Sequence, residues 1–305
     1  MKQRAKVSKR EKWTVFDTIV TILAVVAIIV TLYPMLYVFS CSISDPQAVL
    51  AGKVTLLPIG FSSNAYRIVM KNSDFWRAMM NSVFYVVMTC ALMFFTTVTV
   101  AYPLTRPNLK FRKVLTYYLL IPMYFGGGMI PSYLVISKLG LYNTVWALIL
   151  PASYGIWNII LCRTYMASLS QELIDSALID GCDQIRTLVK IVIPLSKPVI
   201  AVIMIYTIVG VWNSWFNASI YTSAQEIQPL QLYLRQTIVA ASGGMQQQLM
   251  QALPFEEQRL LQQKAMSANQ IKYAMIFISS APIIAVYPMF QKYFTKGIML
   301  GSLKG

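Results

Sequence analysis

Histidine is absent from this chain of 305 residues, and charged residues make up only 12% of it. Histidine is the side chain that most often serves as a general base near neutral pH and as a ligand of transition metals. The four cysteines show neither the spacing of a metal site nor that of a disulfide framework. The sequence therefore predicts no catalytic residue and no metal-binding residue.

A phosphate-binding loop is also missing, since no Gly-x-x-x-x-Gly-Lys-Ser/Thr pattern occurs in the chain. The triplet Gly126-Gly127-Gly128 lacks the flanking strand and the Lys-Ser/Thr pair that such a loop requires. It is typical instead of a loosened helix or of close packing between helices. Any ATP that the protein depends on is therefore expected to be bound by another chain.

Long runs without charge are what the sequence does contain. Hydrophobic residues make up 57% of the chain and the mean hydropathy is +0.57. A helix that crosses a hydrocarbon core of about 30 Å needs roughly 20 such residues. Six charge-free windows meet this need: 18–44, 78–105, 114–137, 139–162, 198–225 and 273–291. The uncharged stretch 236–255 is too rich in Gln and Gly to cross lipid. The predicted fold class is an all-α membrane protein with six transmembrane helices.

The distribution of Lys and Arg predicts the orientation of the chain. Six basic residues precede the first window, four lie in 106–113, four in 163–197 and three after residue 291, so 17 of the 26 would be cytosolic if both termini are cytosolic. The positive-inside rule favours this arrangement. The first apolar run is too long for a secretory signal, which predicts a retained first helix. Because the net charge of +15 is dispersed over short loops, we expect no nucleic-acid partner.

The predicted organisation follows from the windows and the orientation. Residues 1–14 form a cytosolic basic tail, 15–40 the first transmembrane helix, 41–77 an outside loop, 78–292 the transmembrane core and 293–305 a cytosolic tail. The core contains a cytosolic loop, 163–197, and an outside loop, 223–270. In the outside loop, Met245 to Met266 has helical spacing interrupted by Pro254. It either covers a pathway or receives an external partner, or it is an interfacial helix without a partner.

One polar segment interrupts the apolar chain, from Glu172 to Pro194. The pattern predicts a short amphipathic helix over 171–178, with an apolar side formed by Leu173, Ile174, Ala177 and Leu178. The dipeptide Asp180-Gly181 predicts a tight turn, because glycine adopts the left-handed conformation that ends a helix.

A second helix is expected after that turn, over 184–190. Asp183 is a candidate N-cap, and Arg186 and Lys190 lie one i,i+4 step apart on the polar face. Pro194 and Pro198 are expected to end this helix before the fifth window. The result would be a helix-turn-helix in the cytosol, in which the small Ser176 and Ala177 permit a partner to approach closely.

Three short motifs in this segment keep a fixed spacing: Asp175-Ser176-Ala177, Asp180-Gly181-Cys182 and Ile191-Val192-Ile193-Pro194. The segment resembles the EAA loop of binding-protein-dependent ABC importer permeases. That pattern reads Glu-Ala-Ala, two residues, Asp-Gly-Ala, eight residues and Ile-x-Leu-Pro, and both internal spacings are kept here. The chain departs from it at Asp175, Ser176, Cys182 and Ile193.

Two further stretches, Phe125 to Pro131 and Gln291 to Gly305, resemble the LplC-type carbohydrate permeases, so the resemblance covers nearly the whole chain. It implies the type I ABC importer permease fold and a place in a bacterial cell membrane. It also implies four partners: a second homologous permease subunit, an ABC ATPase dimer that binds ATP and Mg²⁺, an extracellular sugar-binding lipoprotein and the lipid bilayer. The expected ATPase-coupling residues are Asp175, Ser176, Ala177, Asp180, Gly181, Cys182, Arg186, Ile191, Ile193 and Pro194.

Aromatic and amide side chains mark a candidate path for a sugar, since stacking and neutral hydrogen bonds recognise carbohydrate. The fourth window offers Tyr154, Trp157 and Asn158, and the fifth offers Trp212, Asn213, Trp215 and Asn217. Aromatics at span ends also serve as interfacial anchors, and Asn residues also bond between helices, so both interpretations stay open.

Two other function classes compete with a permease. A secondary transporter usually places an acidic residue within a span, and every Asp and Glu lies outside the six windows. A polytopic membrane transferase would require paired carboxylates, His or a metal cluster near an interface. The acidic residues between Glu172 and Asp183 are better explained by the loop pattern.

Overall fold

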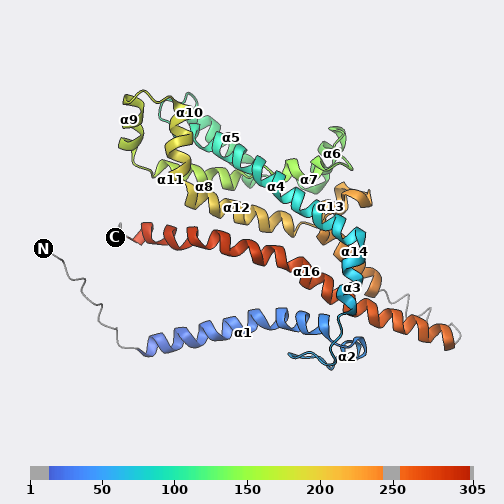
Figure 1. Ribbon diagram of the computed structural model, residues 1–305. Coiled ribbons are helices and arrows are strands. Elements are labelled where there is room, and N and C mark those ends of the chain that lie inside the picture. The colour runs from blue at the N-terminus through green and yellow to red at the C-terminus, as the bar shows by residue number, and fades with distance from the viewer. Residues whose placement is uncertain (1–13, 243–254, 303–305) are drawn as a thin grey trace. The chain divides into compact units, whose positions relative to one another are not determined.

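The computed structural model describes residues 14–242 and 255–302, which are mainly helical (Figure 1). Residues 1–13 of the predicted basic tail, residues 243–254 of the outside loop and residues 303–305 of the C-terminal tail fall outside the described residues. Two compact units divide the described chain: residues 14–68 with 255–277, and residues 69–242 with 278–302. The helices α3 (Asn64–Lys71) and α16 (Phe255–Ser302) each contribute to both units.

The first unit contains α1 (Val15–Ile43), α2 (Pro46–Leu50) and the first part of α16. Thr14 and Asp17 form a capping box at the start of α1, where the Asp17 Oδ2 accepts a hydrogen bond from the Thr14 amide at 2.7 Å. Most of α1 is exposed and apolar, as expected of a helix that faces lipid.

A buried polar cluster closes the far end of α1. The Nε2 of Gln270, a side chain that is 1% exposed, donates to the carbonyl oxygens of Ser44 at 2.6 Å and Ser62 at 3.2 Å. The Oγ of Ser40 donates to the carbonyl oxygen of Leu56 at 2.6 Å. This cluster joins α1, the segment after it and α16 within the first unit.

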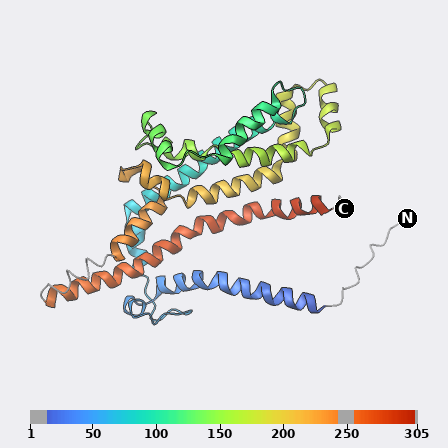
Figure 2. The same ribbon diagram turned by 180° about the vertical axis from the view of Figure 1, so that it is seen from behind.

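The second unit is built on α4 (Ser73–Ala101), α8 (Ile156–Ala167) and α12 (Lys197–Trp212), which pack side by side (Figures 1 and 2). Its main core also receives α9 (Gln171–Ile179) and η2 (Leu188–Val192). The buried core residues are Met93, Val98, Ala101, Tyr102, Ile159, Cys162, Met166, Ile174, Val192, Val199 and Ile203.

The remaining helices of the second unit are short. They are η1 (Pro103–Thr105), α5 (Arg112–Tyr124), α6 (Met129–Lys138), α7 (Trp146–Ala152), α10 (Gln184–Thr187), α11 (Ile193–Leu195), α13 (Phe216–Tyr221), η3 (Gln225–Ile227) and α14 (Leu230–Ser242).

Polar side chains on α4 form hydrogen bonds with η3 and with the start of α14. The Tyr85 hydroxyl donates to the carbonyl oxygen of Ile227 at 2.6 Å, and the Ser82 Oγ accepts from the Leu230 amide at 2.8 Å. Asn81 donates to the carbonyl oxygen of Glu226 at 2.7 Å. The predicted outside loop is therefore partly a packed helical segment.

Four helical stretches of the described chain are long and apolar enough to cross a membrane: Val15–Ile43, Ser73–Thr105, Trp146–Ala167 and Ala268–Gln291. Two bent pairs raise the number to six if each pair is one span. One pair is α5 with α6, bent by 114°, and the other is Gln184–Leu195 with α12, bent by 76°. The exact number of six spans and the cytosolic termini stay predictions.

The helices break where the windows predicted continuity. The third window breaks at Phe125–Gly128, where Gly128 has a φ of +85°, a conformation that glycine adopts without strain. The fourth breaks at Ser153–Gly155, and a Cβ on Gly155 would lie 2.9 Å from the Asn158 Nδ2. The fifth breaks after Trp212. A charge-free run therefore predicts that a segment lies in the membrane, but it does not predict that the helix is unbroken.

Candidate functional site

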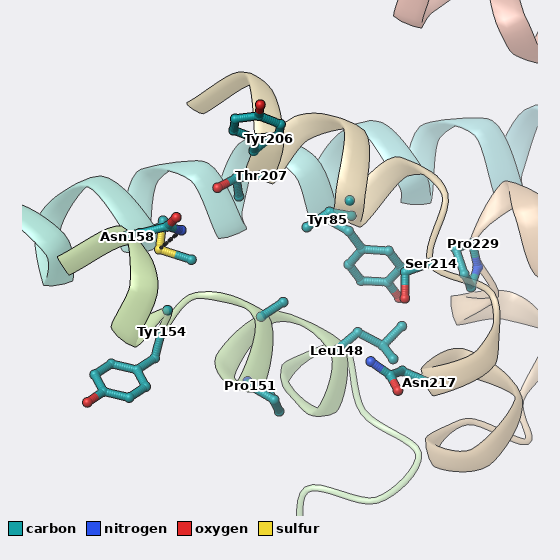
Figure 3. A pocket seen from close by; sticks show the side chains of 15 residues that line it. Tyr85, Leu148, Pro151, Tyr154, Asn158, Tyr206, Thr207, Ser214, Asn217 and Pro229 are labelled. Carbon is teal, nitrogen blue, oxygen red and sulfur yellow. Dashed lines mark hydrogen bonds between the residues drawn. The ribbon is translucent and has the colours of Figure 1, made fainter. Parts of the chain in front are cut away.

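A cavity of about 380 Å³ lies between α4, α7, α8, α12 and α13, within the second unit (Figure 3). Breaks in two helices contribute to its wall, with Tyr154 and Gly155 before α8 and Ser214 after α12. Discontinuous helices in membrane transporters commonly surround a substrate site. The lining residues are Tyr85, Met93, Leu148, Pro151, Ala152, Tyr154, Gly155, Asn158, Tyr206, Thr207, Gly210, Val211, Ser214, Asn217 and Pro229.

Three of the seven predicted path residues line this cavity, namely Tyr154, Asn158 and Asn217. Trp212 does not, because it is 4% exposed and points into the protein interior. The indole of Trp157 is 63% exposed and lies outside the lining, as does Asn213, which caps the end of α12.

Trp215 also lies outside the lining, and a cation occupies one face of its ring. The guanidinium carbon of Arg235, on α14, is 3.4 Å from the ring centroid, and Phe216 meets the ring edge-to-face. A face covered by a guanidinium is not free to stack against a sugar. The interpretation of Trp212 and Trp215 as sugar-stacking residues is therefore not supported by their positions.

Several lining residues were not predicted, and three of them lie at helical intervals. Tyr206, Gly210 and Ser214 recur at intervals of four, and the predicted Asn217 follows three residues later, which places one polar or small face along the fifth window. The sequence signal for these residues was the helical spacing of hydroxyl side chains and a glycine within an otherwise apolar window. Tyr85 gave no such signal, since its position opposite α12 depends on tertiary packing.

The lining carries no ionisable acid or base other than tyrosine phenols. The Thr207 Oγ already donates to the Ile203 carbonyl oxygen at 2.9 Å, and the Asn158 Nδ2 contacts the Met93 Sδ at 3.5 Å. The cavity can therefore offer neutral hydrogen bonds and apolar contact to a guest, which suits a hydroxyl-rich molecule.

The second candidate site is the segment around Gly181, whose predicted turn is confirmed. Gly181 has a φ of +81°. The Cys182 amide donates to the Ala177 carbonyl oxygen at 2.9 Å and the Gly181 amide to that of Leu178 at 3.1 Å. These two bonds are those of a Schellman motif, which ends α9.

The N-cap prediction is also confirmed, since the Asp183 Oδ1 accepts a hydrogen bond from the Arg186 amide at 2.7 Å. The second helix was also expected to end before the fifth window, and it does end there, at Leu195, before α12 begins at Lys197. The helix passes from α10 into the π-helical turn η2, which contains Ile191, and continues as α11, with Ile193 and Pro194 in its first turn. A π-turn shifts the hydrogen-bond register, so the chain continues past a residue that has no amide hydrogen.

The two sides of α9 have different surroundings. Ile174 and Ala177 are buried at 2% and 6% exposure, and Ile174 belongs to the core shared with α4, α8 and α12. The expectation that Ala177 faces a partner is not met, because its methyl group packs inside the chain. Ser176 is exposed, and its Oγ donates to the Glu172 carbonyl oxygen at 2.8 Å.

Apolar side chains around the turn remain exposed, namely Leu173, Ile179, Ile185 and Val189. Three charged residues are also exposed, namely Asp175, Asp180 and Arg186, and Cys182 is half-buried. Asp175 lines a second cavity of about 370 Å³ together with Arg106 and Gln171, and its Oδ1 accepts from the Gln171 Nε2 at 3.1 Å. An exposed apolar cluster with a charged rim is typical of a protein-binding surface.

Residues 7–300 match the family described as binding-protein-dependent transport system inner membrane component. The chain belongs to this family. As a member, it is a multi-pass protein of a bacterial cell membrane and a transport permease, which confirms the resemblance seen in its sequence. Membership also sets aside the secondary transporter and the membrane transferase.

Known permeases resemble the chain along most of its length. It is 38% identical over 281 residues to Protein LplC of Bacillus subtilis (strain 168), covering 90% of each chain. It is 34% identical to the polygalacturonan/rhamnogalacturonan transport system permease protein YtcP of the same organism, covering 95% of this chain and 98% of that one.

A crystal structure of a bacterial ABC transporter involved in the import of the acidic polysaccharide alginate contains a similar chain. That chain is 33% identical, with a TM-score of 0.81, and the alignment covers 93% of this chain and 99% of that one. The agreement over nearly complete chains supports the helical architecture described above.

Proposed function

We propose that this chain is the permease subunit of an ATP-driven importer and forms half of the pathway for a carbohydrate, expected to be an oligosaccharide. Relatives named for polygalacturonan/rhamnogalacturonan and alginate support carbohydrate as the substrate class. The uncharged, hydroxyl-bearing cavity between α4, α8 and α12 is the proposed pathway surface.

Four partners complete the proposed importer. A second homologous permease subunit forms the other half of the pathway within the lipid bilayer, and an extracellular sugar-binding lipoprotein delivers the substrate. An ABC ATPase dimer binds ATP and Mg²⁺ and contacts the segment 171–195. This subunit is then non-catalytic and binds no cofactor of its own.

The observation that carries the proposal is the two-sided environment of α9. One side is buried with Ile174 in the core of α4, α8 and α12, and the same three helices line the cavity. The other side exposes Ile179 beside the turn at Gly181. A displacement imposed on the exposed side would therefore reach the cavity wall through packed side chains, which deform little.

The pathway is tested by filling the cavity with Gly210→Trp. Gly210 lines the cavity, and a Cβ there meets no atom within 4 Å, so the indole has space to enter. We expect ATP-driven sugar uptake into proteoliposomes containing the complete importer to fall by at least tenfold while ATP-binding partners stay assembled.

The matched control is Val209→Trp, because Val209 is exposed on the same helix and lies outside the cavity lining. We expect this variant to retain uptake. Full uptake by Gly210→Trp would contradict the assignment of the cavity to the pathway.

A further inference from the structure

We propose that Arg235 recognises a carboxylate at the rim of the cavity, so that the carbohydrate carried by this importer contains uronic acid residues. The inference rests on the proposed function and specifies the charge of its substrate. It assigns a role to a cation that lies over the ring of Trp215.

The guanidinium of Arg235 lies over an aromatic face. Its carbon lies 3.4 Å from the centroid of the Trp215 ring. A stacked guanidinium keeps its N–H groups at the edge of the plane, where they can donate two parallel hydrogen bonds to a carboxylate. The stack thus fixes the orientation of the fork before a ligand arrives.

No acid in the described part of the chain occupies this fork. Among the described residues, the salt bridge is between Arg77 and Asp74, and Arg235 makes neither an ion pair nor a hydrogen bond there. Arg235 is exposed on α14, so water or a solute reaches it. The nearest acid in sequence, Glu226, is exposed and unpaired with Arg235.

Both partners of the stack lie close in sequence to residues that line the cavity. Trp215 directly follows Ser214 and precedes Asn217, and the two polar residues line the cavity (Figure 3). Pro229 also lines the cavity, immediately before α14, the helix that carries Arg235.

The position of α14 is fixed by α4. The buried Ser82 Oγ accepts the Leu230 amide hydrogen at 2.8 Å, and Asn72 donates to the Tyr233 hydroxyl at 2.9 Å. Arg235 therefore projects from a helix that is held in place against α4.

A cation at the rim and a neutral wall beyond it would handle an acidic sugar differently from a neutral one. A carboxylate gains charge-assisted hydrogen bonds at Arg235, whereas the lining deeper in the cavity offers no second cation to retain it. A neutral sugar meets the same hydroxyl and amide groups but gains nothing from the guanidinium. Discrimination between acidic and neutral sugars should therefore depend on Arg235 and on the charge of the sugar alone.

The test compares trigalacturonate with galactotriose in proteoliposomes that contain the complete importer. We expect the wild type to import trigalacturonate and Arg235→Gln to raise its half-saturating concentration by about tenfold or more, the value of a charged hydrogen bond. Arg235→Lys should be intermediate, because it keeps the charge and loses the planar fork. Any import of galactotriose should be unchanged in both variants.

Lys138→Gln is the matched control, since it removes another exposed cation from the second unit without touching the stack. Equal loss of both sugars in Arg235→Gln would overturn the proposal and assign the stack a structural role. Weaker docking of the sugar-free lipoprotein to Arg235→Gln would also overturn it, because the carboxylate would then belong to a protein. A wild type that imports galactotriose and not trigalacturonate would refute the acidic substrate while leaving the proposed importer standing.

Discussion

At the scale of single residues, Gly181 has the conformation with the clearest functional consequence. A Cβ at this position would meet no atom within 4 Å, so a substitution there is opposed by the backbone and not by crowding. Its φ of +81° costs an L-residue about 1 kcal/mol or more. The turn that separates α9 from α10 therefore depends on this glycine for its geometry.

Gly181→Pro is expected to abolish ATP-driven uptake while the protein remains in the membrane. Proline fixes φ near −65° and removes the amide that donates to Leu178, so the Schellman motif cannot form. Uptake into proteoliposomes and the amount of protein in the membrane fraction would be measured together.

Gly140→Pro is the control for this substitution. Gly140 also has a positive φ, of +69°, open space around its Cβ position and an amide that donates to a carbonyl oxygen, here that of Ser137. If Gly140→Pro and Gly181→Pro impair uptake equally, the loss reflects backbone strain in general and the coupling role of Gly181 is wrong.

Gln270 gives a second prediction at this scale. Gln270→Leu removes the donor shared by the carbonyl oxygens of Ser44 and Ser62 in a buried setting. Leaving buried acceptors unsatisfied should lower the free energy of unfolding by about 2 kcal/mol. Thermal unfolding in detergent would show this as a lower Tm, whereas Gln291→Leu, an exposed position of the same helix, should leave the Tm nearly unchanged.

At the scale of elements, the two sides of α9 separate stability from coupling. Ile174→Ala removes a side chain that is 2% exposed and should cost about 2–5 kcal/mol of stability. Ile179→Ala removes one that is 86% exposed and should leave the Tm unchanged while it weakens binding of the ATPase dimer. Tm and ATPase co-purification would be measured for both variants.

An Ile179→Ala variant that binds the ATPase normally and imports normally would exclude the apolar cluster as the contact surface. Ala177→Trp cannot serve in this test, although its small size suggested a contact position. Ala177 is 6% exposed inside the chain's own core, so an indole there would disrupt the packing of α9.

Local chemistry explains which element boundaries were predictable. The Schellman turn at Gly181 and the N-cap at Asp183 depend on neighbouring residues, and both were read from the sequence. The π-helical turn η2 was not, since it forms in a helix whose Val192 is buried in the tertiary core. The cavity was found only in part for the same reason, because Tyr85 and Met93 reach its wall through the packing of α4 against the neighbouring helices.

At the scale of the whole molecule, the orientation in the membrane determines whether the proposed coupling segment can reach an ATPase. The positive-inside count predicts that Gly181 is cytosolic and that Lys138 is outside. Helix breaks do not change this prediction, provided that α5 with α6 crosses the membrane once. Sidedness is thus the feature on which the pathway, the coupling segment and the rim cation all depend.

Cysteine labelling tests this orientation with few changes to the chain. Cys182 is half-buried at the turn, whereas Cys41 and Cys162 are buried. In a Cys41→Ser, Cys90→Ser, Cys162→Ser background, a membrane-impermeant maleimide should label Cys182 in inside-out vesicles and not in intact cells.

With Cys182→Ser and Lys138→Cys added, the pattern should reverse, because Lys138 is exposed at the end of α6. Labelling of both positions from one side would mean that the Trp146–Ala167 helix does not cross, and the six-span topology would be wrong.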